Sequence, residues 1–184
     1  MSIYRDSLKE SGDECRPDNQ RLEQIIAGSL LCLLPLPNRS WLDVGAGQAK
    51  AEQRITGFGF TYMSQDPAPK QPVDVTIPFH TIRTHKFGVV SAFHVIEHVP
   101  CYVNFLKDMK GLVEAGGYAV VSTPLKVQTE YHYRAFAKGS HVLNSLIALG
   151  NLIASFDIHE DRFVRTDAMA GITDPKSILS IWKP

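Results

Sequence analysis

A short apolar strand that runs straight into a glycine turn restricts most strongly what this chain can fold into. Residues 41–44 are apolar apart from Asp43, and glycines follow at positions 45 and 47. Glycine lets the backbone approach a ligand closely, and a helix predicted over residues 48–56 would present unpaired N–H groups to that ligand. The segment therefore predicts a strand–turn–helix unit that holds a nucleotide or nucleoside at the carboxyl end of the strand.

The other apolar segments alternate between strand and helix patterns. Strands are predicted over residues 60–64, 73–75, 87–93, 118–122, 155–159 and 178–182, and helices over residues 18–34, about 105–113 and 140–149. Such alternation indicates an α/β fold with a mainly parallel sheet. The 184 residues, 44% of them hydrophobic, contain no repeat or linker. We expect a single domain over residues 1–184, in which residues 1–17 form a flexible or folded-back arm.

Composition narrows the partners and the compartment. Nineteen basic and nineteen acidic residues give no net charge, which argues against nucleic acid and anionic membranes as partners and favours a small-molecule substrate. The three cysteines lack the spacing of a disulfide framework or a zinc site. The longest apolar run, residues 30–36, is too short to span a bilayer. We therefore expect a soluble, cytoplasmic protein.

Two aspartates lie near the ends of the second and third predicted strands. Asp66 lies 23 positions after Asp43, where a carboxylate can accept hydrogen bonds from both hydroxyls of a ribose. Asp74 lies in the short third predicted strand, near its end, where it can face the edge of an adenine. An ordinary tight turn explains the same residues equally well, and the glycine and aspartate pattern alone leaves both readings open.

Four segments, taken in order, are similar to a known family. They are LDVGAGQA, YMSQDPAP, FGVVSAFHVIEHV and LVEAGGYAVVSTP, which together cover residues 41–124. In order and spacing they resemble the class I S-adenosylmethionine-dependent methyltransferases, particularly the type 11/23-like small-molecule group that includes ubiquinone-pathway O-methyltransferases. The resemblance implies a Rossmann-like sheet with helices on both faces. It also implies that S-adenosylmethionine binds and leaves as S-adenosylhomocysteine.

The resemblance also assigns roles to single residues. It places Asp43, Gly45 and Gly47 at the methionine moiety, Asp66 at the ribose, Asp74 with Val75 at the adenine edge, and Phe93 with His94 on the other side of the cofactor, with Gln48 in further contact. It places the acceptor-binding loop after the predicted strand 118–122, where Tyr131, His132 and Arg134 lie. A solvated loop is the alternative for these last three residues.

The chain departs from the family pattern in composition and in length. Ala49 stands where many relatives have glycine, Gly88 where many have aspartate, and His94 where aspartate or asparagine is frequent, which predicts a modest affinity for the cofactor. Seven residues separate Asp66 from Asp74, and about a dozen precede the next strand, so both crossovers are too short for the usual helix. We expect the amino-terminal arm or a second subunit of a homodimer to cover this sheet edge.

Methyl transfer from a sulfonium needs alignment more than an elaborate catalytic apparatus. A hydroxyl acceptor must lose a proton, and His98 and His94 are the candidate bases. Glu97 is adjacent to His98, but neighbouring positions on a helix point about 100 degrees apart, which weakens a direct partnership. We assign no metal ion to the site.

Three other functions remain open from the sequence. The shortened crossovers also fit a module that binds S-adenosylmethionine without turnover. A nicotinamide-dependent oxidoreductase has a similar glycine turn, although Ala49 replaces the third glycine of the dinucleotide fingerprint. A nucleic-acid methyltransferase would need a local basic patch, for which Lys107, Lys110 and Arg134 are the candidates.

Overall fold

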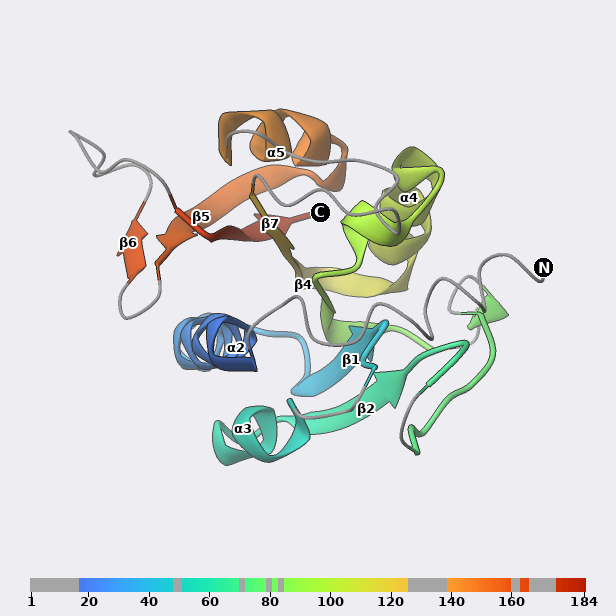
Figure 1. The fold of residues 1–184 in the computed structure, drawn as a ribbon. Coiled ribbons are helices and arrows are strands. Elements are labelled where there is room, and N and C mark those ends of the chain that lie inside the picture. Colours follow the sequence, from blue (N-terminus) through green and yellow to red (C-terminus); the bar gives the residue numbers. More distant parts are fainter. Residues whose placement is uncertain are drawn as a thin grey trace.

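The computed structural model describes residues 17–47, 51–69, 72–78, 81–82, 85–125, 139–159, 163–165 and 175–184. A seven-stranded sheet forms its centre, in the order β2-β1-β3-β4-β7-β5-β6 (Figure 1). The strands are β1 (Ser40–Val44), β2 (Thr61–Gln65), β3 (Phe87–Phe93), β4 (Val113–Pro124), β5 (Asn151–Ile158), β6 (Phe163–Arg165) and β7 (Ser177–Lys183).

The strand directions bring most strand ends to one edge of the sheet. β1 is parallel to β2 and β3, and β3 is parallel to β4. β7 is antiparallel to both β4 and β5, so β5 runs in the same direction as β4. The carboxyl ends of β1 to β5 therefore share one edge, called the carboxyl edge below. β7 starts there as well, because Ser177 pairs with Pro124 and Ile158.

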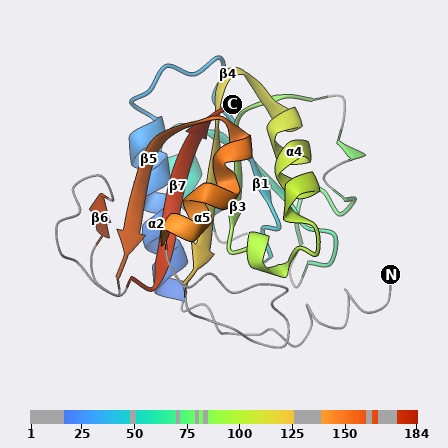
Figure 2. The same cartoon turned by 90° about the horizontal axis from the view of Figure 1, so that it is seen from above.

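Helices cover both faces of the sheet, as the sequence predicts (Figures 1 and 2). On one face lie α2 (Pro17–Leu31) and α3 (Glu52–Gly57), and on the other lie α4 (Tyr102–Leu112) and α5 (Gly139–Leu146). Successive strand residues serve opposite faces: Trp41 packs in the core under α2 and α3, and Leu42 packs in the core under α4 and α5. The Rossmann-like α/β fold is thus confirmed. Within the described residues, no helix is long and apolar enough to cross a membrane.

The predicted third strand, residues 73–75, is reduced to a single bridge. Val75 pairs with Gln65 as an isolated parallel bridge, supported by hydrogen bonds from Asp66 N–H to Val75 O and from Val75 N–H to Ser64 O, both 3.0 Å. The described residues between β2 and β3 contain no α-helix. The short crossovers expected from the sequence are therefore present, and the chain there is too short to extend the sheet by a full strand.

Several boundaries differ from the prediction. α2 ends at Leu31 instead of residue 34, and the chain turns before Pro35. β4 begins at Val113, directly after α4, although the glycine pair suggested that the helix ends there and the strand begins at Tyr118. β6 was not predicted, because three residues carry too little periodicity to mark a strand.

The structure gives a physical reason for Gly88. A Cβ atom at this position would lie 2.1 Å from the backbone oxygen of Asn38. The Gly88 N–H donates to the Asn38 side-chain oxygen at 3.0 Å, so the segment before β1 is held directly against β3. A side chain as large as aspartate would not fit here.

Candidate active site

The turn between β1 and α3 needs both of its glycines. Gly45 and Gly47 have φ angles of 70° and 56°, in the left-handed region that glycine favours. A Cβ atom at Gly45 would also lie 2.6 Å from Cγ2 of Val95, whereas at Gly47 the nearest atom would be the Gly45 oxygen at 4.0 Å. The turn therefore packs tightly against the segment after β3, whereas no described residue beyond its chain neighbours comes closer than 4.0 Å to a Cβ atom at Gly47.

Asp66 connects this turn to the end of β2. Its carboxylate accepts hydrogen bonds from the N–H of Gly47 at 2.9 Å and from the N–H of Ala68 at 2.8 Å. Ala46 N–H donates to the backbone oxygen of Gln65 at 2.9 Å, which adds a second link. Each carboxylate oxygen has a further lone pair, so Asp66 can still accept a hydrogen bond from a ligand.

Asp43 lies below the turn as a buried carboxylate. Ser91 Oγ donates to it at 2.6 Å and Tyr62 Oη at 2.7 Å, so both oxygens have partners. Burial raises the pKa of Asp43 from 3.8 to about 6, the two hydrogen bonds oppose this increase, and the charge of Asp66 adds to it. Burial also raises the pKa of Tyr62, which keeps this hydroxyl protonated as a donor. A contact of Asp43 with the cofactor stays a prediction.

Asp74 and Val75 fix the short segment beside β2. One oxygen of Asp74 accepts hydrogen bonds from the backbone N–H and the hydroxyl of Ser64, both at 2.7 Å. Gln65 donates from Nε2 to the backbone oxygen of Ile77 at 2.7 Å, and its buried Oε1 has no hydrogen-bond partner. An unsatisfied acceptor therefore lies where the resemblance places the adenine edge.

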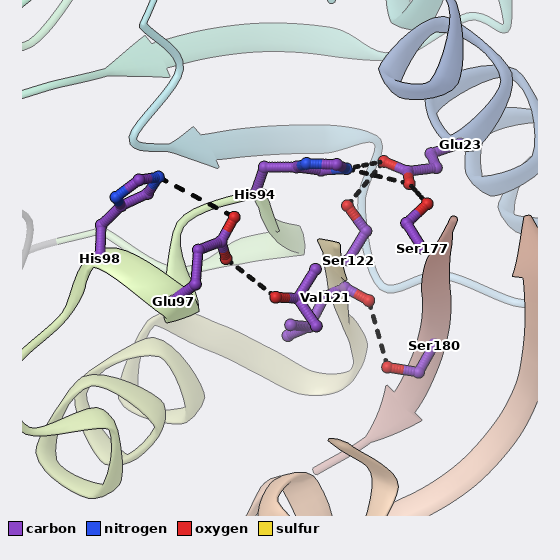
Figure 3. Close-up of polar contacts among 9 residues, drawn as sticks. Glu23, His94, Glu97, His98, Val121, Ser122, Ser177 and Ser180 are labelled. Atoms are coloured by element: carbon purple, nitrogen blue, oxygen red, sulfur yellow. Dashed lines mark hydrogen bonds and ion pairs between the residues drawn. The ribbon is translucent and has the colours of Figure 1, made fainter. Parts of the chain in front are cut away.

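His94 belongs to a buried polar network that the sequence analysis missed (Figure 3). Its Nε2 lies 3.0 Å from both carboxylate oxygens of Glu23, which is fully buried on α2. Glu23 also accepts hydrogen bonds from the hydroxyls of Ser122, at 2.7 Å, and Ser177. His94 has a φ angle of 55°, and its backbone N–H donates to the backbone oxygen of Ser122 at 3.0 Å. The network thus holds His94 in a backbone conformation that few residues adopt.

The sequence contains one signal that Glu23 is buried. Glu23 lies three and four positions before Ile26 and Ala27, which are both buried, so it occupies the apolar side of its helix. A glutamate at such a position predicts a buried partner. The identity of that partner depends on the fold, because His94 lies 71 positions further along the chain.

Glu97 and His98 are neighbours in a short 3-10 helix. They belong to the 3-10 helix η2 (Ile96–His98), and Glu97 Oε1 is 3.9 Å from His98 Nε2 (Figure 3). The Glu97 side chain is 1% exposed, and its Oε2 accepts a hydrogen bond from Thr123 Oγ1 at 2.9 Å. The two groups are therefore within ion-pair distance but too far apart for a hydrogen bond, which agrees with a weak direct partnership. Among the described residues, no three His, Cys, Asp or Glu side chains form a metal-binding group.

The remaining predicted residues divide into two groups. Phe93 ends β3 with its side chain in the core under α2 and α3, 6% exposed. Gln48, Tyr131, His132 and Arg134 lie outside the described residues. Their roles at the cofactor and the acceptor stay predictions.

Unsatisfied polar atoms are spread along the carboxyl edge, from β2 to β5. The described residues include four buried side-chain atoms without a hydrogen-bond partner: Gln65 Oε1, Glu97 Oε1, Asp157 Oδ1 and His159 Nε2. All four follow or end strands at this edge. Burial raises the pKa of Asp157, and nearby His159 opposes this increase. Because buried polar groups are normally satisfied, these atoms mark positions along the edge that can take a further hydrogen-bond partner.

Comparison with known proteins agrees with this geometry. Residues 18–155 match the profile of the methyltransferase domain family. The chain belongs to this methyltransferase family. The predicted family and enzyme class are thereby confirmed. No curated protein sequence matches this methyltransferase significantly.

Solved structures show the same fold at low sequence identity. The methyltransferase is similar to 1,6-didemethyltoxoflavin-N1-methyltransferase from Burkholderia thailandensis, with a TM-score of 0.73, 15% identity, and coverage of 98% of this chain and 84% of that chain. It is also similar to an S-adenosylmethionine-dependent methyltransferase from Archaeoglobus fulgidus (TM-score 0.61, 13% identity, coverage 90% and 94%). A third similar structure is the glycopeptide N-methyltransferase MtfA (TM-score 0.60, 13% identity, coverage 92% and 96%).

Proposed function

We propose that this methyltransferase binds S-adenosylmethionine at the carboxyl edge and transfers the methyl group to a small-molecule acceptor. The hydrogen bond from Gly47 N–H to Asp66 at 2.9 Å carries the proposal, because it joins the open glycine turn to the carboxylate expected at the ribose. The similar Burkholderia enzyme was crystallised with S-adenosylhomocysteine, and MtfA with S-adenosylmethionine. These ligands support the same cofactor here.

The residues present fit a nucleoside of this kind. Among the described residues, none beyond its chain neighbours fills the space beside Gly47. Asp66 has lone pairs to offer a ribose, and the unsatisfied Gln65 Oε1 can accept an N–H from a base. The proposed cofactor contacts are Asp43, Gly45, Gly47, Gln48, Asp66, Asp74, Val75, Phe93 and His94.

The bound sulfonium supplies an electrophilic methyl group. The chain's task is then to align the acceptor, exclude water and take the proton that the acceptor loses. His98 is the stronger candidate for the proton, because its side chain is 19% exposed at the carboxyl edge. His94 Nε2 faces the Glu23 carboxylate, so His94 is better suited to line the cofactor site. Tyr131, His132 and Arg134 remain the proposed acceptor contacts.

The partners and compartment follow from composition. With no net charge, the chain suits a small acceptor better than a nucleic acid. Cys32 and Cys101 are both unpaired, which supports the reducing cytoplasm as its location. A homodimer or the amino-terminal arm is proposed to cover the edge beside β2.

Calorimetric titration with S-adenosylmethionine, S-adenosylhomocysteine and NAD tests the cofactor. We expect the two sulfur nucleosides to bind and NAD not to bind. Asp66→Ala should weaken S-adenosylhomocysteine binding by about 1.5–3 kcal/mol, the range for hydrogen bonds to a charged group. Asp108→Ala, at an exposed position on α4, is the matched control and should bind normally.

Three outcomes would contradict parts of this proposal. Binding of NAD alone would favour an oxidoreductase. An unchanged affinity in a folded Asp66→Ala variant would remove Asp66 from the site. Tight binding of both sulfur nucleosides without methyl transfer to any metabolite offered would favour a module that only binds the cofactor.

A further inference from the structure

A buried carboxylate oxygen without a donor lies next to an imidazole at the carboxyl edge. Glu97 Oε1 has no hydrogen-bond partner, although the Glu97 side chain is 1% exposed. His98 Nε2 lies 3.9 Å away, which is beyond hydrogen-bonding distance (Figure 3). An unsatisfied buried carboxylate is expensive, so the arrangement is expected to gain a donor when a ligand binds.

The position of Glu97 is built into the fold. Thr123, near the end of β4, donates to Glu97 Oε2 at 2.9 Å and leaves Oε1 directed toward His98. His98 N–H donates to the backbone oxygen of Val95 at 2.9 Å. Val95 itself packs so closely on Gly45 that a Cβ atom there would lie 2.6 Å away. The pair is therefore held beside the turn proposed to bind the cofactor.

We propose that Glu97 and His98 together bind the nucleophilic O–H or N–H group of the methyl acceptor. One oxygen or nitrogen atom can lie about 2.9 Å from both Glu97 Oε1 and His98 Nε2, because these two atoms are only 3.9 Å apart. Such an atom must carry a hydrogen to satisfy the carboxylate. The inference rests on the proposed function and restricts the acceptor to a protic nucleophile, which excludes carbon acceptors.

The transfer step follows from this placement. The acceptor oxygen or nitrogen forms a bond to the methyl carbon, the methyl–sulfur bond breaks, and its electron pair stays on sulfur. The acceptor hydrogen, which is donated to Glu97 Oε1 in the bound complex, turns toward His98 and moves to its Nε2 as the new bond forms. Glu97, with Oε1 3.9 Å from that nitrogen, stabilises the imidazolium formed. Glu97 is thus a catalytic residue, since it contacts the acceptor.

The test uses the protein saturated with S-adenosylhomocysteine and pairs of small probes that differ only in their donor. The pairs are phenol and anisole, aniline and N,N-dimethylaniline, and cyclohexanol and methoxycyclohexane. Binding is followed by NMR of the ¹⁵N-labelled His98 ring. We expect a protic probe to shift the His98 signals and to bind about 10-fold or more tightly than its methylated partner.

Variants separate Glu97 from a general effect of charge. If the glutamine of Glu97→Gln keeps its oxygen toward Thr123, its amide N–H replaces the acceptor that faces His98. If its oxygen faces His98, the hydrogen bond from Thr123 is lost. The variant should abolish the preference for protic probes. Its affinity for S-adenosylhomocysteine should stay within about 3-fold, which also shows that it folds. Glu114→Gln removes a carboxylate at the opposite end of β4 and should change neither property.

Three results would overturn the inference: no shift of His98 by any protic probe, equal binding of the members of each pair, or an unchanged preference in Glu97→Gln. The first two need no variant, so they hold even where Glu97→Gln does not fold. Failure of S-adenosylhomocysteine to bind the unaltered protein would instead overturn the proposed function.

Discussion

Replacing Asp43 with asparagine should stabilise the folded chain at neutral pH. Burial raises the pKa of Asp43 from 3.8 to about 6, so the folded state holds the proton more tightly than the unfolded state does. A difference of this size corresponds to about 3 kcal/mol, at about 1.4 kcal/mol per pH unit. The stabilisation of the folded state by protonated Asp43 is fully present below about pH 4 and is lost as the pH rises through about 6.

Asparagine removes the titration while keeping the shape of the site. The side-chain oxygen of the asparagine can accept the hydrogen bond from Ser91. Its amide N–H can donate to the Tyr62 oxygen, so the hydrogen bond between the two side chains is kept with its direction reversed. The variant therefore avoids the buried negative charge above pH 6. We expect it to unfold with a free energy up to about 3 kcal/mol larger than that of the unaltered chain at pH 7.5, and with a similar free energy at pH 4.

Urea unfolding of both proteins at pH 4, 5, 6 and 7.5 measures this difference. Asp108→Asn, which changes an exposed carboxylate on α4, is the control and should show no such pH dependence. A stability difference between Asp43→Asn and the unaltered chain that is constant from pH 4 to 7.5 would show that Asp43 does not titrate as a buried acid. The variant also tests a direct contact with the cofactor, since losing such a contact weakens S-adenosylhomocysteine binding.

Four further substitutions can be checked by urea or thermal unfolding. Gly45→Ala should destabilise the fold by at least about 1–2 kcal/mol, because Gly45 has a positive φ and a Cβ atom there would collide with Val95. Gly111→Ala is the control: Gly111 lies in a helix with nothing within 4 Å of an added Cβ atom, so alanine should stabilise the fold by about 0.5–1 kcal/mol. Equal effects of the two substitutions would contradict both assignments. Glu23→Ala should lower the free energy of unfolding by about 3 kcal/mol or more, because the buried side chains of His94, Ser122 and Ser177 lose their acceptor at about 1–3 kcal/mol each. A loss below about 1 kcal/mol would argue against the network. Gly88→Ala should cost about 1–3 kcal/mol through overpacking, and a neutral result would mean that the backbone there moves easily.

The parts of the fold that sequence could predict are those set by local pattern. β3 matches its predicted range of 87–93, and β1 differs by one residue, because both strands are short apolar runs bounded by polar or glycine residues. The short crossovers were predictable from the number of residues between the predicted strands, which is too small for a helix. The glycine turn was predictable because positive φ at Gly45 and Gly47 is a requirement of the backbone itself.

The parts that sequence could not predict depend on contacts between distant segments. Glu23 is a partner of His94 only because α2 lies against the ends of β3 and β4. The approach of Glu97 to His98 depends on a 3-10 helix of three residues, which is too short to leave a periodic pattern. Pairing with β3 decides that β4 begins at Val113, since Phe87 takes Val113 as its partner.

The Glu23 network has a consequence for folding during synthesis. Glu23 accepts a hydrogen bond from Ser177, which the ribosome adds 154 residues later, at the start of β7. A nascent chain that lacks β7 leaves this carboxylate short of a donor and leaves the edges of β4 and β5 unpaired. We therefore expect the backbone around His94 to reach its final conformation only after β7 has emerged and inserted between the two strands.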